Sequence, residues 1–252
     1  LREERSPIPR AVRDFVLLPW RGADQRDAAI LLVLDRARTA QEAHALHLRF
    51  RSAAQLALDD GAVCATIGAT RLGLRRLAAS GGDDEVRRLP RGDCFSDRYT
   101  RGNCDASRFV ASELRLQVPG PTPSAAFAIE VAAAKGAAGA PPTALPSEGG
   151  QAWLIERGTS RWVVAAADGS AALAYRLPPG SAATHIVLPA AAAGSARAKV
   201  AMSRVEGECR FAPGGREGVE VGGAPLVFVV DAECAVRELP GKKPRAQRKP
   251  AA

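Results

Sequence analysis

The sequence is poor in aromatic residues, methionine and histidine, and it lacks the motifs of several enzyme classes. Aromatic residues make up 5% of its 252 residues, with one methionine and three histidines. No P-loop, GxGxxG after a strand, GxSxG or HExxH motif occurs, so nucleotide and nucleotide-cofactor chemistry find no support. No CxxC spacing points to a cysteine zinc site. No apolar run reaches the roughly 18 residues of a membrane span. We expect no cofactor, no assigned metal and no membrane span.

Positive charge is plentiful but concentrated at one end of the chain. The formal net charge is +8, and five basic residues lie in the segment GKKPRAQRKPAA. This segment has no apolar periodicity, so we expect 241–252 to form a disordered basic tail. Binding to nucleic acid through the tail is one hypothesis, but the rest of the chain is only mildly basic. We therefore expect no nucleic-acid partner.

The sequence consists mainly of short apolar runs of strand length, such as DFVLLPW and SRWVVAAADG, separated by Gly and Pro. In the second half these runs return about every eight to twelve residues, which is typical of an antiparallel sandwich. We predict an all-β fold, a large supersandwich-like antiparallel β-sandwich over 14–240 with almost no helix. The best helix candidate, 191–200, has no apolar stripe. Residues 1–13 are expected to be a linker, and 135–150, rich in Gly and Pro, could divide the sandwich.

The five cysteines are compatible with two disulfides and one free thiol. Cys94 and Cys104 flank a polar loop, and Cys209 and Cys234 lie in successive strand candidates, whereas Cys64 has no evident partner. Such pairing would suit an exported protein, and reduced cysteines are the alternative. We expect a periplasmic or secreted location.

The segment HALHLRF holds two of the three histidines, His44 and His47. On a strand, residues three apart point to opposite faces, so the two cannot easily share a metal ion. His44 lies on the side of the apolar residues. His47 lies on the side of Arg49 and Arg51, so it faces a polar, cationic surface. His47 is therefore a candidate proton acceptor, the alternative being an ordinary polar strand face.

Three stretches in order resemble the C-terminal β-sandwich of heparinase II/III-like polysaccharide lyases, over about residues 10–240. The first is LLVLDRART, with Asp35 and Arg36, and the second is HALHLRF, with His47. The third is FSDRYTRGNCDASRFVASELRLQVPGPTPSAAFAI, whose Ser96–Tyr99 matches the family's S-x-x-Y-G loop, although Thr100 stands where the family has Gly. Asp35 and Arg36 could also be a structural ion pair at a strand end.

The resemblance implies a β-elimination enzyme acting on an acidic, uronic-acid-containing polysaccharide. In such an enzyme, substrate lies between this sandwich and an N-terminal α/α-toroid of the same polypeptide. This chain shows no toroid and begins in LREERSPIPR, so we expect it to follow an absent helical domain and to be inactive alone. The resemblance makes His47 the catalytic candidate. The residues expected to bind the acidic glycan are Arg49, Arg98, Tyr99 and Arg101.

A non-catalytic carbohydrate-binding or cell-surface sandwich is the alternative function. Its sites would be exposed aromatic residues, for which Trp20, Trp153 and Trp162 are the candidates. Tryptophans on strands more often belong to the core. Exposure of Trp162, which follows Arg161, would favour this alternative.

Overall fold

The structure is a computed structural model, and every regular element that it describes is a β-strand, as the sequence predicts. The chain divides into two compact units, Leu1–Gly139 and Ala140–Ala252, and this boundary falls inside the segment 135–150. The described residues are 10–21, 27–38, 45–59, 62–79, 84–88, 112–122, 124–133, 139–167, 173–180, 183–188, 197–213, 219–222 and 226–238.

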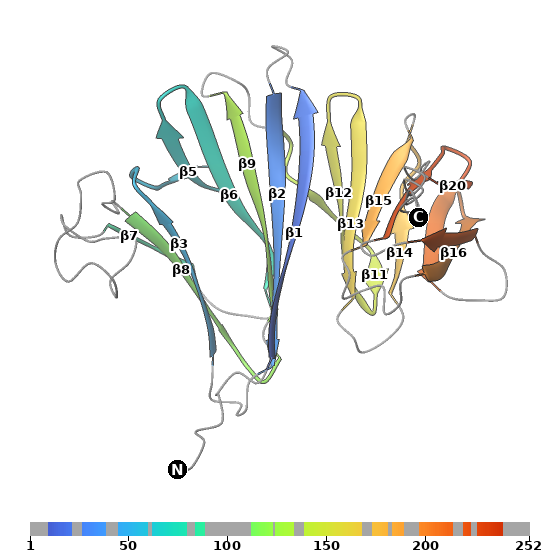
Figure 1. Cartoon of the computed structure of the whole chain (residues 1–252), viewed down its shortest axis with the longest axis horizontal. Helices are drawn as coiled ribbons and strands as arrows, with labels where there is room; N and C mark the ends of the chain where they lie inside the picture. The colour runs from blue at the N-terminus through green and yellow to red at the C-terminus, as the bar shows by residue number, and fades with distance from the viewer. Residues whose placement is uncertain are drawn as a thin grey trace, which may run out of the picture. The chain divides into compact units, whose positions relative to one another are not determined.

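The first unit contains two antiparallel sheets (Figure 1). The larger sheet has the order β1-β2-β9-β6-β5-β4 and the smaller sheet the order β3-β8-β7. The larger sheet is built from β1 (Arg10–Arg21), β2 (Asp27–Arg38), β9 (Ser124–Ala133), β6 (Thr70–Ala79), β5 (Ala62–Ile67) and β4 (Ala57–Asp59). The smaller sheet is built from β3 (Ala45–Ser52), β8 (Ser112–Pro119) and β7 (Asp84–Arg88).

The two sheets of the first unit pack against each other through their apolar faces. One buried cluster joins Val33 and Phe127 of the larger sheet to Leu48 and Leu116 of the smaller one. Phe50 packs edge-on against Phe127, with ring centroids 4.8 Å apart. Each such side chain contributes about 1.5–3 kcal/mol when it leaves water. Because side chains alternate along a strand, the polar residues of β3 and β8 point away from this core.

The second unit also contains two sheets, with the orders β10-β12-β13-β15-β19-β20 and β11-β14-β17-β16-β18. The first is built from β10 (Thr143–Leu145), β12 (Gly150–Arg157), β13 (Ser160–Ala167), β15 (Thr184–Leu188), β19 (Leu226–Val230) and β20 (Val236–Glu238). The second is built from β11 (Ser147–Glu148), β14 (Ala174–Leu177), β17 (Glu208–Pro213), β16 (Arg197–Val205) and β18 (Val219–Gly222).

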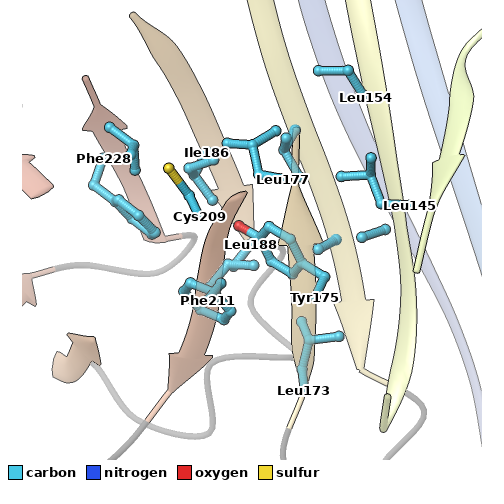
Figure 2. Packing of buried hydrophobic residues seen from close by; sticks show 14 of the residues in the cluster. Leu145, Leu154, Leu173, Tyr175, Leu177, Ile186, Leu188, Cys209, Phe211 and Phe228 are labelled. Atoms are coloured by element: carbon cyan, nitrogen blue, oxygen red, sulfur yellow. The ribbon is translucent and has the colours of Figure 1, made fainter. Parts of the chain in front are cut away.

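The core of the second unit lies between these sheets and is rich in aromatic rings (Figure 2). Tyr175 and Phe211 stack with ring centroids 4.7 Å apart, and Phe228 follows at 6.0 Å from Phe211. A disulfide links Cys209 on β17 to Cys234 in the turn after β19, so it connects the two layers covalently. Cys94 and Cys104 lie outside the described residues.

Four details differ from the sequence-based expectation. β1 begins at Arg10, inside the expected linker, and β16 covers 197–200 of the helix candidate. β7 lies within the polar stretch 79–104, whose sequence carries no apolar alternation that would predict a strand. Its only apolar residue is Val86, which is exposed, so an edge strand of this kind leaves almost no hydrophobic pattern. Finally, β13 and β15 pair in parallel within an otherwise antiparallel architecture.

Candidate functional site

The candidate site is the outward, polar face of the small sheet β3-β8-β7, here called the outer face. Along β3, Leu48 is buried whereas His47 and Arg49 are exposed, as the alternation in the sequence predicts. Arg51 is half-buried on the same side. The strand places these side chains about 7 Å apart, at every second residue.

The register between β3 and β8 adds residues that the sequence did not single out. His47 lies directly opposite Gln117, Arg49 opposite Arg115, and Arg51 opposite Glu113. Directly opposite residues share a face, with Cβ atoms about 4.5–5.5 Å apart. The outer face is therefore a ladder of three polar pairs. β7 extends it on the other side of β8, where Glu85 lies opposite Arg115.

Glu113 fixes one end of the outer face. Its carboxylate is completely buried and accepts hydrogen bonds from Nε of Arg51, at 2.7 Å, and from Nε of Arg115. Burial raises the pKa of Glu113, but these hydrogen bonds and the two positive charges lower it by more, so the pKa lies below its ordinary value. Glu113 is thus held as an anion that anchors two guanidinium groups.

A buried hydroxyl secures the strand ends beside this ion-pair cluster. The Ser112 hydroxyl is fully buried, accepts a hydrogen bond from the Leu56 N–H at 2.9 Å and donates one to the Ala54 carbonyl at 2.8 Å. Ser52, opposite Ser112 in the register, accepts from the Ala54 N–H at 3.1 Å. The bend after β3 is therefore tied to the start of β8.

The other end of the outer face is open and carries unneutralised positive charge. Arg49 and His47 have no hydrogen-bond or ion-pair partner among the described residues, and both are exposed. Arg49 lies opposite Arg115, whose charge is already balanced by its hydrogen bond to the Glu113 carboxylate, so Arg49 is the cation of this pair that remains for an anion to bind. The open end is therefore suited to a negatively charged ligand.

The other expected ligands of the glycan, Arg98, Tyr99 and Arg101, lie outside the described residues, as does His44. The chain from 89 to 111, which carries the three ligands, connects β7 to β8. Its two ends leave from the cross-strand pair Arg88 and Ser112, next to Glu113.

Asp35 and Arg36 form ion pairs, but each pairs across to β1 rather than with the other. Arg13 donates to both carboxylate oxygens of Asp35, at 2.6 and 2.9 Å, and Arg36 donates to Asp14 at 2.6 Å. Asp35 is buried, and its pairing with Arg13 raises the pKa of that guanidinium through a hydrogen bond and charge attraction that outweigh burial. These contacts support the structural interpretation of the pair.

Two of the three aromatic candidates of the alternative function lie in the interior, and the third, Trp20, is half-buried on β1. Trp153 and Trp162 are 3% and 8% exposed, so neither offers a ring to a sugar. In the part of the chain described, no three His, Cys, Asp or Glu side chains gather closely enough to hold a metal ion. His185 lies half-buried on β15, away from any such group.

Comparison with protein families and with curated sequences finds no match. Within the described ranges, no helix is long and apolar enough to cross a membrane. The geometry of the outer face is therefore the main basis for a functional hypothesis.

Proposed function

We propose that this chain is the β-sandwich part of a polysaccharide lyase that acts by β-elimination on a uronic-acid-containing polysaccharide. The outer face of β3, β8 and β7 binds the acidic chain. The observation that carries the proposal is the exposed Arg49, which has no partner among the described residues and lies one step along the ladder from the exposed His47.

The chemistry of these side chains fits a polymer of carboxylates. A guanidinium presents a planar set of donors that matches a carboxylate, and charged hydrogen bonds of this kind are about twice as strong as neutral ones. Glu113 already occupies the Nε donors of Arg51 and Arg115, which leaves Arg49 as the cation most available to a ligand. A uronate carboxylate bound there would lie beside the His47 imidazole.

β-Elimination requires a base that removes the C5 proton next to the carboxylate and a positive group that stabilises the enolate-like charge. It also requires an acid that protonates the C4 oxygen as the C4–O bond breaks and the C4–C5 double bond forms. His47 can accept that proton, and Arg49 can stabilise the charge. Arg98, Tyr99 and Arg101, on the connection between β7 and β8, are proposed as further ligands of the glycan. The helical toroid would supply the opposite wall of the cleft and the remaining catalytic groups.

The binding half of the proposal is tested by titrating this chain with polygalacturonate oligosaccharides in a calorimeter. Arg49→Ala should weaken binding about tenfold, the lower range for a charged hydrogen bond at an exposed site. Added salt should weaken binding of the unmodified chain as well. Arg204→Ala, which removes an exposed arginine of the second unit, is the matched control. Unchanged affinity in Arg49→Ala, or no binding by the unmodified chain, would refute the proposal.

The catalytic half requires a protein that includes the helical domain. Formation of unsaturated products, followed by ultraviolet absorbance, should disappear in His47→Ala while polysaccharide binding persists. An upstream reading frame without a helical domain of a few hundred residues would remove the lyase interpretation. Binding without elimination by the longer protein would instead favour the non-catalytic carbohydrate-binding alternative.

A further inference from the structure

Gln117 is the one uncharged amide at the open end of the outer face. It lies on β8, exposed, directly opposite His47 and two residues from Arg115 on the same side. No described residue forms a hydrogen bond with its side chain. His47, Arg49, Arg115 and Gln117 thus occupy two adjacent cross-strand pairs, an area about 5 Å by 7 Å.

The Gln117 amide can accept hydrogen bonds, which the two arginine side chains cannot do. A guanidinium only donates hydrogen bonds, whereas the Gln117 amide both donates and accepts. A carboxylate only accepts hydrogen bonds, so the Arg49 guanidinium, which only donates, is suited to it. A sugar hydroxyl both donates and accepts hydrogen bonds, as do the Gln117 amide and the neutral His47 imidazole opposite it. In the proposed reaction His47 takes the proton of the sugar ring, which leaves Gln117 for the hydroxyl. The open end therefore pairs an anion-binding half with a hydroxyl-binding half.

We propose that Gln117 is a specificity residue that selects polymers in which a carboxylate and a hydroxyl are neighbours, namely polyuronates, over polyanions without hydroxyl groups. This inference rests on the proposed binding function of the outer face. Arg49 supplies affinity for the charge. Gln117 supplies the distinction between an acidic sugar and any other carboxylate polymer, because its exposed amide can form a hydrogen bond with a sugar hydroxyl that the other polymers lack.

The test compares two ligands, polygalacturonate oligosaccharides and poly-L-glutamate of similar length, for four proteins. Gln117→Leu, which keeps the side-chain size, should lose about two- to tenfold in affinity for the polyuronate and nothing for polyglutamate. Arg49→Ala should lose affinity for both polymers. Gln151→Leu, at an exposed glutamine of β12, should match the unmodified chain for both. For each ligand, the affinity of a variant is compared with that of the unmodified chain. Differences in flexibility between the two ligands therefore cancel.

The outcomes separate the two hypotheses. Full polyuronate affinity in Gln117→Leu, or an equal loss for both polymers, overturns the role of Gln117 and leaves the binding function intact. Undiminished binding in Arg49→Ala overturns the proposed function. A loss confined to the polyuronate in Gln117→Leu, beside a loss for both in Arg49→Ala, supports both.

Discussion

Removing the Cys209–Cys234 disulfide should lower the free energy of unfolding of the second unit by about 3.5 kcal/mol. The bond closes a loop with a sequence separation of 25 residues. In the chain-entropy treatment, a loop of that size removes about 12 cal/mol/K of entropy from the unfolded chain, or about 3.5 kcal/mol at 25 °C. The double variant Cys209→Ala/Cys234→Ala loses this constraint and also the packing of two buried sulfur atoms.

Urea unfolding followed by tryptophan fluorescence measures this effect. Trp153 and Trp162 are buried in the second unit and should report its unfolding. With a slope of about 2 kcal/mol/M, the midpoint should fall by about 1.5–2 M. Cys64, the free cysteine among the described residues, is kept in both proteins.

Reductant provides the control. It should lower the midpoint of the unmodified chain almost to that of the double variant, because both then lack the cross-link. Reductant can also act on the remaining cysteines. Any shift in the urea midpoint that it causes in the double variant measures this effect and is subtracted. Equal midpoints for the oxidised unmodified chain and the double variant would refute the reasoning, since the bond would then contribute nothing.

Three further predictions concern single residues. Tyr175→Phe should raise the free energy of unfolding by about 1 kcal/mol in urea titrations, because the buried hydroxyl has no hydrogen-bond partner among the described residues; a destabilised variant would indicate a hidden partner. Gly180→Ala should cost about 2 kcal/mol, because its Cβ would lie 2.2 Å from Nη1 of Arg161, which donates to Thr184; an unchanged midpoint would contradict this packing. Glu113→Gln should cost about 2–3 kcal/mol at pH 7. Since the folded pKa of Glu113 is lowered, its contribution is complete above the unfolded value of about 4.3 and is lost as pH falls through the folded value. The two stability curves should therefore converge on acidification, and parallel curves would exclude this role.

The sequence predicts the fold class because strand periodicity is local. The alternation in β3 places Leu48 inside and His47 outside, and the structure confirms both positions. The strand that pairs with β3 cannot be predicted from this local pattern. Arg51 and Glu113 lie 62 residues apart in the sequence, and only the register between β3 and β8 joins them. The run ELRLQVP shows that Glu113 and Gln117 share a face, but not which strand they oppose.

The cysteines illustrate the same limit. Cys209 and Cys234 lie on segments of different sheets, so their approach depends on how two layers pack and not on spacing along the chain. Sequence reasoning left this pairing open, and the structure forms it. β7 was missed for another reason: four of its five residues are charged, and an edge strand can form without an apolar face.

The parallel pair of β13 and β15 has a consequence for how the second unit folds. Between these neighbours the chain crosses to the other layer to form β14, and between β15 and its next neighbour β19 it forms β16, β17 and β18 there. Strands of both sheets must therefore form before either sheet is complete. The search for the native state must therefore close long loops early, which slows folding toward the millisecond-to-second range. It also makes β20, the last of the described strands in chain order, a requirement for completing a sheet whose central strands are made much earlier.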